Sequence, residues 1–453
     1  KGRRTILPKM LATISKGLSQ LANHHGFRRY FFNTSWMFLE QTLRLISGLF
    51  VGIYVARYLE PEQFGTYSYV VAFVALFTPI NRLGLDGIVV RELVNRPEQH
   101  SIYLGTAFWL KLIGAAASMS LVSIAIYFSN NDYTTNLYIF IAASGLCFQA
   151  FDVVQFYFQS AVLSKYISIS RIIQLSISSL LKIYLVFINS DLFWFVVITV
   201  FDQLILAVFF LLSYWKKNRT PFIKFFRLSC AKSMIKNSWP IILSGVAITL
   251  YMRVDQIMIK EMLGDREVGI YSAAARLSEA WYFAPVIITT SLFPAILNAK
   301  KIDLAIYNQR LTWLYRFMVY SALGVAIPVS LFSQIIILTL YGNQYYGAGL
   351  VLSIHVWAGI FVALGTVNGS WFLAENLQKK ATINTLIGVA INVLLNYFLL
   401  PVYGIAGAAY ATLISYSTAA YLTLFLHQET RQQFYIITSA IFSPTRKSTS
   451  DSI

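Results

Sequence analysis

Stretches of about twenty apolar residues recur along the whole of this chain, and stretches of that length are typical of transmembrane helices. Each stretch can cross a hydrocarbon core of about 30 Å as an α-helix. Only 12% of the 453 residues are charged, whereas about a quarter are charged in soluble proteins. The sequence therefore predicts an all-α integral membrane protein without a soluble catalytic domain.

The apolar stretches predict about twelve transmembrane helices, about six in each half of the chain. The predicted spans are 36–58, 66–84, 104–128, 135–156, 167–188, 192–215, 239–260, 269–296, 312–341, 349–373, 382–402 and 406–427. We therefore divide the chain into an N-terminal arm, an N-lobe, a basic linker, a C-lobe and a C-terminal tail, covering residues 1–33, 34–215, 216–236, 237–427 and 428–453.

Lysine and arginine lie mainly in alternate connections between the predicted spans. The connections 129–133, 189–191, 342–349 and 401–404 contain neither residue, and Lys260 and Arg266 are the main exceptions on that side. Because basic residues mark the cytoplasmic side, we expect both termini and the linker in the cytoplasm. This topology accounts for most of the net charge of +17, so we expect no nucleic-acid partner.

The two halves of the chain share a pattern that repeats 204 positions later. Residues 33–73 align without a gap on residues 237–277, and both segments contain an apolar run, a short charged break and a second apolar run. The aligned identities are Asn33 with Asn237, Leu39 with Leu243, Ile53 with Ile257, Leu59 with Leu263, Gly65 with Gly269, Tyr67 with Tyr271 and Ser68 with Ser272. An even number of spans per half predicts parallel repeats, with substrate bound between them.

Sequence motifs of enzymes are missing from the chain. It contains no Walker A, HExxH, paired CxxC or G-x-S-x-G motif, and its five histidines are scattered. These absences argue against an ATPase, a zinc site and a hydrolase. We therefore predict a protein that is not an enzyme and that uses no cofactor.

Ionisable residues inside the apolar stretches are the candidates for function. Each costs about 2.5–3.5 kcal/mol at the centre of a span, so each should face a partner or a wet cavity. Glu40 and Arg44 are four residues apart, which fits either a local ion pair or a cavity role. The hairpin of the seventh and eighth spans has the densest group, with Arg253, Asp255 and the stripe Ser272, Arg276, Glu279 and Phe283. Lys111 and Asp202 are single charges in other spans, for which cross-helix ion pairs, or snorkelling near a helix end, are the alternatives to a cavity role.

The run Ile53–Ser68, followed by Arg82–Asp86 and Arg91-Glu92, resembles the opening of Wzx-type polysaccharide flippases. The runs Arg253–Ile259 and Val268–Phe283 are similar to the start of that family's second half. The resemblance implies the MATE-like fold of the multidrug/oligosaccharidyl-lipid/polysaccharide exporters, with two six-helix lobes in a V. It further implies alternating access, transfer of undecaprenyl-diphosphate-linked oligosaccharide to the outer leaflet and coupling to a proton or sodium gradient.

The chemistry of such a substrate fits the charges, because a diphosphate and sugars cannot cross hydrocarbon unaided. We expect cationic Arg44, Lys111, Arg253 and Arg276 to attract the diphosphate, and acidic Asp202, Asp255 and Glu279 to bind the coupling ion. The expected partners are lipid-linked oligosaccharide, a proton or sodium ion, membrane lipids and polysaccharide polymerase machinery. The expected location is the cytoplasmic membrane of a bacterium or archaeon.

Three other functions remain open from the sequence. One is a non-transporting scaffold, which would leave the buried charges without a role. A drug or cation exporter of the same fold would transport a lipid-free amphipathic cation. A membrane polymerase or ligase would need a substantial outer loop for catalytic residues, and every predicted outer connection is short.

Overall fold

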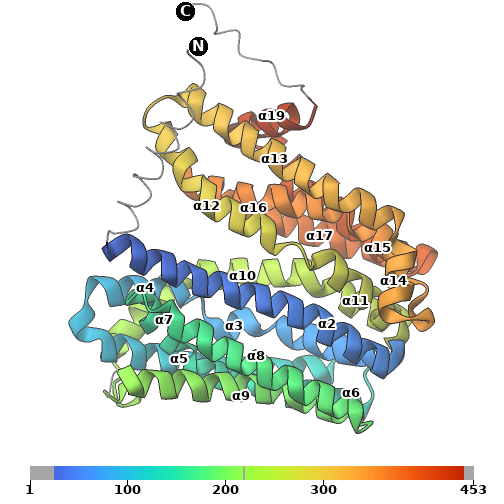
Figure 1. Ribbon diagram of the computed structural model, residues 1–453, viewed down its shortest axis with the longest axis horizontal. Helices are drawn as coiled ribbons and strands as arrows, with labels where there is room; N and C mark the ends of the chain where they lie inside the picture. Colours follow the sequence, from blue (N-terminus) through green and yellow to red (C-terminus); the bar gives the residue numbers. More distant parts are fainter. Residues whose placement is uncertain (1–24, 218–219, 443–453) are drawn as a thin grey trace, which may run out of the picture.

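The computed structural model describes residues 25–217 and 220–442, so most of the predicted arm and the end of the tail lie outside the described residues. The described ranges contain helices and no strand. They form two lobes that lie side by side, with the N-lobe in blue to green and the C-lobe in yellow to red (Figure 1). The predicted all-α membrane fold is confirmed.

The N-lobe contains eight α-helices within the described residues. They are α2 (His25–Ala75), α3 (Thr78–Arg82), α4 (Asp86–Asn95), α5 (His100–Tyr127), α6 (Tyr133–Ser144), α7 (Val153–Ser160), α8 (Ser164–Phe187) and α9 (Leu192–Lys217). The short 3-10 helices η1 (Pro97–Gln99) and η2 (Gly145–Asp152) connect some of them.

The C-lobe follows η3 (Phe222–Lys224), a short helix in the linker. Its helices are α10 (Leu228–Leu263), α11 (Asp265–Glu279), α12 (Phe283–Lys300), α13 (Leu304–Leu331), α14 (Ser333–Tyr341), α15 (Ala348–His355), α16 (Ala358–Ala374), α17 (Gln378–Tyr403), α18 (Ile405–Ala420) and α19 (Gln428–Phe442), with η4 (Asn343–Tyr345) and η5 (Leu422–Phe425) between them. Helix α19, in the predicted tail, packs on α13, where Gln433 donates a hydrogen bond to the Tyr315 hydroxyl.

The number of membrane spans agrees with the sequence. Among the described residues, ten helices are long and apolar enough to cross a membrane, or eleven if one bent pair counts as a span. The first of these, residues 35–75, itself contains two helices that meet at Glu60. About twelve spans, as predicted, are therefore consistent with the structure.

Several predicted spans differ from the structure in detail; for example, the spans 66–84, 312–341 and 349–373 are each divided between two helices. Two further differences concern the helices at the site. Helix α10 begins at Leu228, well before the predicted start at residue 239, because Lys232 and Lys236 are compatible with a helix that extends out of the membrane. The predicted span 269–296 is interrupted between α11 and α12, at residues 280–282. Hydropathy measures the length of an apolar stretch and does not detect an interruption of the helix within it. The sequence therefore does not predict this interruption.

The same backbone break occurs at paired positions of the two repeats. Glu60 has φ 58° and ψ 170°, and Gly264, its counterpart 204 positions later, has φ 96° and ψ 178°. This region of backbone space is essentially restricted to glycine, so Glu60 is strained where Gly264 is not. The two repeats therefore agree in backbone geometry as well as in sequence.

Replacing Glu60 with glycine is expected to raise stability by about 1 kcal/mol, because strain of this type costs about 1–3 kcal/mol. The thermal midpoint of the purified protein in detergent would measure the change. Glu62→Gly is the matched control, since Glu62 lies in ordinary helix and its loss should lower stability by about 0.5–1 kcal/mol. A lower midpoint for Glu60→Gly would contradict the assignment of strain.

The two lobes touch at the end of the molecule that contains these breaks, which we call the closed end. A Cβ atom on Gly65 would collide with the carbonyl of Asp265, and one on Gly269 would collide with the carbonyl of Pro61. The two contacts are equivalent under the repeat. The Tyr345 hydroxyl also donates to the carbonyl of Ala56, at 2.7 Å.

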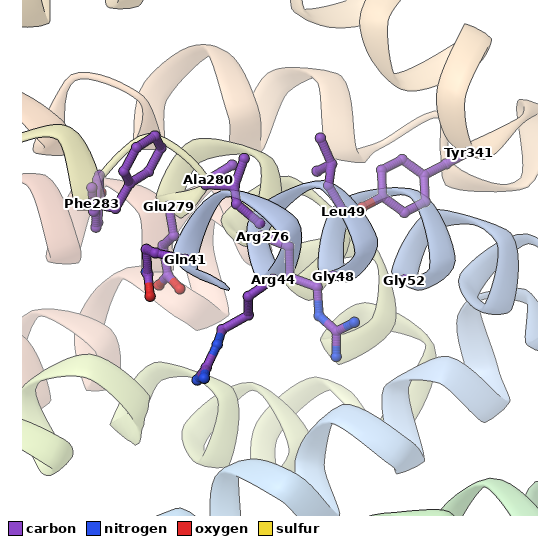
Figure 2. A pocket seen from close by; sticks show the side chains of 12 residues that line it. Gln41, Arg44, Gly48, Leu49, Gly52, Arg276, Glu279, Ala280, Phe283 and Tyr341 are labelled. Atoms are coloured by element: carbon purple, nitrogen blue, oxygen red, sulfur yellow. The ribbon is translucent and has the colours of Figure 1, made fainter. Parts of the chain in front are cut away.

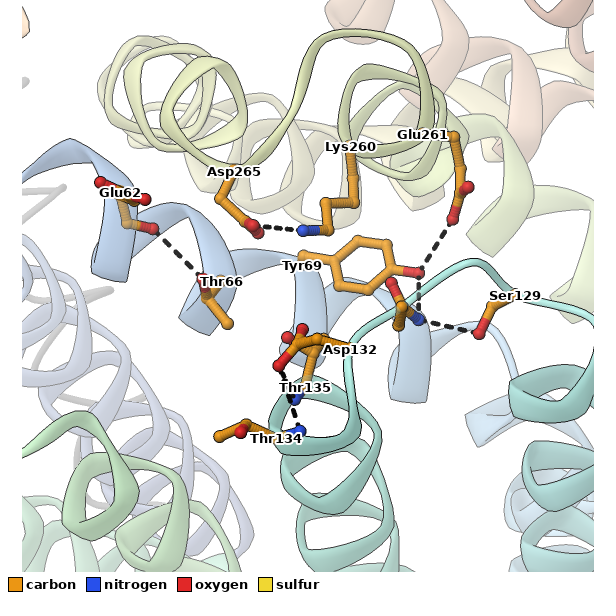
Figure 3. A network of polar contacts seen from close by, with 11 residues as sticks. Glu62, Thr66, Tyr69, Ser129, Asp132, Thr134, Thr135, Lys260, Glu261 and Asp265 are labelled. Atoms are coloured by element: carbon orange, nitrogen blue, oxygen red, sulfur yellow. Dashed lines mark hydrogen bonds and ion pairs between the residues drawn. The ribbon is translucent and has the colours of Figure 1, made fainter.

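Polar side chains add to this contact (Figure 3). The Tyr69 hydroxyl of the N-lobe donates to Glu261 of the C-lobe at 3.4 Å and accepts from Asn131 at 3.1 Å. Lys260, one of the two basic residues that lie on the side otherwise poor in lysine and arginine, forms an ion pair with Asp265. Local pairing therefore neutralises this lysine at the closed end.

The opposite end contains the basic connections, and we call it the basic end. Here Lys300 pairs with Glu375 at 2.6 Å and Lys380 pairs with Glu429. The linker is held against α5 by a hydrogen bond of 2.9 Å from the Trp109 indole to the carbonyl of Ile223. In Figure 1, α12 and α13 diverge from α2 toward this end.

Candidate functional site

A cavity of about 570 Å³ lies between the lobes, and we call it the central cavity. One wall is α2 from Gln41 to Gly52, and the other is formed by the end of α11, the start of α12 and Tyr341 (Figure 2). The central cavity lies between the two repeats, beside the contact at the closed end. This is the position in which the repeats predict a bound substrate.

Arg276 projects into the central cavity from α11. The preceding part of α11 is packed tightly on α2 through small residues such as Gly269 and Ala273, and Arg276 follows where this packing ends. Its guanidinium lies over the Phe64 ring, 4.8 Å from the ring centroid, and within the described residues it makes no salt bridge. Its charge is therefore available to an anion.

Arg44 lines the central cavity from the opposite wall. In Figure 2 its side chain and that of Arg276 point toward the same side of α2. Arg44 forms an ion pair with Glu40, and the other oxygen of Glu40 lies 3.7 Å from Arg171. Glu40 is thus shared between two arginines, and the Arg44 side chain remains 47% exposed. The sequence allowed either a local ion pair between Glu40 and Arg44 or a cavity role. The structure has the ion pair, and Arg44 also lines the cavity.

Glu279 lines the same cavity and pairs with Arg253, with 3.9 Å between Nη1 and Oε2. The group of ion-paired and cavity-lining charges thus contains Arg44, Arg171, Arg253 and Arg276 against Glu40 and Glu279. Two positive charges remain uncompensated in this group. Such a surplus favours an anionic ligand.

Asp255 lies inside the C-lobe, apart from the central cavity. Its side chain is 6% exposed and accepts hydrogen bonds from the Tyr271 hydroxyl and, at 2.8 Å, from the amide of Gln256. The Tyr271 hydroxyl also lies 3.4 Å from Thr412 Oγ1 on α18. The predicted hairpin cluster is therefore split, with Arg276 and Glu279 at the cavity and Asp255 buried behind them.

Lys111 and Asp202 lie in a separate cavity of about 320 Å³ within the N-lobe, which we call the N-lobe cavity. Lys111 is 1% exposed, with Nζ 3.6 Å from Asp152 Oδ2. Asp202 accepts from Lys182 at 3.3 Å, while its other oxygen is buried without a partner. The structure therefore does not bring Lys111 together with Arg253 and Arg276. Cross-helix pairing is realised at both positions.

Sequence reasoning missed Arg171 and gave Arg82 no role at the site. Arg171 shares Glu40 with Arg44, and both Arg171 and Arg82 line the N-lobe cavity. Arg171 falls within the predicted span 167–188, so its charge in an apolar stretch was a usable signal. Arg82 was noted as part of a family pattern, and its place beside a cavity depends on the short helices α3 and α4.

The chain matches the family model described as "Polysaccharide biosynthesis protein" over residues 31–300, which is more than half of its length. The capsular polysaccharide biosynthesis protein CapF of Staphylococcus aureus is 22% identical over 403 residues, covering 84% of this chain and 95% of CapF. A protein of Shigella dysenteriae that is named for O-antigen transport is 24% identical over 392 residues, covering 84% of this chain and 96% of that protein.

Two kinds of solved transporter structure share the fold. The lipid II flippase MurJ in an inward closed conformation superimposes with a TM-score of 0.68 and 15% identity, covering 90% of each chain. A MATE family multidrug transporter in an inward-facing conformation gives a TM-score of 0.65 and 14% identity, covering 88% of this chain and 96% of the transporter. At these identities the likeness concerns the fold. The chain is a multi-pass membrane protein that belongs to the polysaccharide biosynthesis protein family of transporters.

Proposed function

We propose that the protein transfers undecaprenyl-diphosphate-linked oligosaccharide from the inner to the outer leaflet of the cytoplasmic membrane of a bacterium or archaeon. The observation that carries the proposal is the pair Arg44 and Arg276, which face one cavity from the two lobes. A guanidinium from each side suits the two phosphates of a diphosphate, because arginine binds phosphate in a bidentate manner.

The charge of the central cavity distinguishes this function from the main alternative, a drug or cation exporter of the same fold. An exporter of amphipathic cations would present a negative or neutral cavity, whereas the group around Arg44 and Arg276 has a surplus of positive charge. This surplus supports an anionic headgroup over a cationic drug.

The contacts at the two ends support alternating access. With both termini and the linker in the cytoplasm, the basic end faces the cytoplasm, and the contact between Gly65 and Asp265 closes the outer side. The substrate headgroup then enters the central cavity from the inside. Transport requires the closed-end contacts to separate while the basic end closes.

Coupling to a proton or sodium gradient is assigned to Asp255. It belongs to a buried polar group with Tyr271 and Thr412, on the helix that also contains Arg253. Helix α17, which packs against α10, presents buried Asn392 and Asn396, each with an amide atom that has no partner among the described residues. Of these two amide atoms only Asn396 Oδ1 is an acceptor. A buried carboxylate and an unpartnered amide oxygen on two helices that pack together suit a small cation.

Asp255→Asn is expected to remove the dependence of transport on the ion gradient, because the amide can neither take up a proton nor supply a negative ligand to Na⁺. Transport into proteoliposomes would be measured over a range of pH and Na⁺ gradients. Asp303→Asn is the matched control, because Asp303 is the N-cap residue of α13 and, among the described residues, its side chain only accepts a hydrogen bond from the amide of Ala305. An unchanged gradient dependence in Asp255→Asn would remove this residue from the coupling role.

The proposed function is tested by reconstituting the full chain in liposomes with a fluorescent undecaprenyl-diphosphate oligosaccharide. We expect the sugar to become accessible to an external lectin faster than in protein-free liposomes. Transport of a lipid-free amphipathic cation without transport of the lipid-linked sugar would instead establish the drug exporter.

A further inference from the structure

The central cavity adjoins two other cavities of different chemistry. Arg44 lines both the central cavity and the N-lobe cavity. Tyr282 lines both the central cavity and a cavity of about 540 Å³ between α10, α16, α17 and α18, which we call the C-lobe cavity. A molecule held at Arg44 and Arg276 therefore has a compartment on either side.

The C-lobe cavity has no Asp, Glu, His, Lys or Arg in its lining. Its walls include Ile248, Met252, Phe361, Val362 and Phe372, with hydroxyl and amide groups between them. The apolar part of this lining suits hydrocarbon, because sugar hydroxyls placed against apolar walls lose hydrogen bonds to water.

The N-lobe cavity has the opposite character. Its lining combines four glutamines with acidic and basic side chains: Gln149, Gln155, Gln174, Gln203, Asp86, Asp152, Asp202, Arg44, Arg82, Lys111 and Arg171. Among the described residues, no hydrogen bond is formed by the amides of Gln174 and Gln203, and Asp202 Oδ1 is buried without a partner. Asp202 Oδ1 thus lacks a donor that a ligand could supply, and the half-buried amides of Gln174 and Gln203 are free to bind a ligand in the cavity.

Most charges of the N-lobe cavity are already compensated. Lys111 pairs with Asp152, Lys182 pairs with Asp202, and Arg44 and Arg171 share Glu40. The lining has four cations against three carboxylates, so a phosphate in this cavity would lie close to carboxylates that repel it. It offers both donors and acceptors to a neutral ligand that can also donate and accept, and sugar hydroxyls do both.

We propose that the N-lobe cavity binds the sugar residues that directly follow the diphosphate. This inference rests on the proposed function, and it adds an orientation to the substrate: sugars toward the N-lobe, diphosphate between Arg44 and Arg276, and hydrocarbon toward the C-lobe. The cavity of about 320 Å³ is at the small end of ligand sites, so it takes about one or two sugar rings rather than a whole oligosaccharide.

The test compares two kinds of probe on the purified full chain. One is farnesyl diphosphate, and the other is farnesyl diphosphate that carries N-acetylglucosamine, galactose or glucose. We expect at least one sugar-bearing probe to bind about tenfold more tightly than farnesyl diphosphate, as a few additional hydrogen bonds would give. The double variant Gln174→Leu/Gln203→Leu should lose this gain and keep the affinity of the wild type for farnesyl diphosphate.

Gln432→Leu on α19 is the matched control, since Gln432 is exposed at the basic end, and we expect both affinities to stay unchanged. The inference alone is overturned if the wild type binds farnesyl diphosphate but gains nothing from any of the three sugars, or if the double variant keeps the gain. A double variant that instead shifts the Na⁺ or pH dependence of transport would identify a cation site and overturn it too. Failure of the wild type to bind farnesyl diphosphate at all would overturn the proposed function itself.

Discussion

Replacing Arg276 with alanine is expected to lower export of lipid-linked oligosaccharide by roughly tenfold to a hundredfold, since a hydrogen bond to a charged group contributes about 1.5–3 kcal/mol. Arg276 lines the central cavity and has no salt bridge among the described residues, so its loss removes positive charge that nothing else replaces. Complementation of a flippase-deficient strain and transport in proteoliposomes would measure the loss.

Arg266→Ala is the matched control for this experiment. Arg266 lies on the same helix, α11, but its side chain is exposed and it does not line the central cavity. We expect normal export for Arg266→Ala and partial export for Arg276→Lys, because lysine keeps the charge but not the bidentate geometry. Full complementation by Arg276→Ala, at normal protein level in the membrane, would contradict the role of Arg276.

The second large effect is expected from Gly65→Ala at the closed end. The added Cβ meets the main-chain carbonyl of Asp265, and backbone cannot yield as a flexible side chain can. Overpacking of this kind costs about 1–3 kcal/mol, which shifts the balance between the closed and separated lobe ends by about five- to 150-fold. We expect export to fall to a similar degree, because the proposed transport cycle requires this end to close.

Hydrogen–deuterium exchange separates this explanation from misfolding. In Gly65→Ala the segments 61–69 and 265–272 should lose protection, while the interiors of the two lobes keep theirs. Gly324→Ala on α13 is the control, since a Cβ there meets nothing within 4 Å. Normal export by Gly65→Ala, or loss of protection throughout the chain, would count against a gate at this contact.

Much of the fold could be predicted because the bilayer requires long apolar helices. The apolar stretches gave the helical class and about twelve spans, and the alignment of Leu59 with Leu263 placed the breaks at Glu60 and Gly264 in equivalent positions. The break at residues 280–282 could not be predicted, because the apolar run continues through it.

The candidate site could be predicted in part. Charge in an apolar stretch is visible in a sequence, and it led to Arg44, Arg276, Asp255 and Asp202. Which charges share a cavity depends on how the helices are rotated and packed, and periodicity within one helix does not contain that information. Lys111 was for this reason grouped with Arg276, although it pairs with Asp152 inside the N-lobe.

The contact between Gly65 and Asp265, and its counterpart between Gly269 and Pro61, is made by main chain. This contact at the closed end therefore does not depend on the side chains that line the central cavity. Side chains that line the central cavity can therefore differ among relatives without disturbing this contact, provided that both glycines remain.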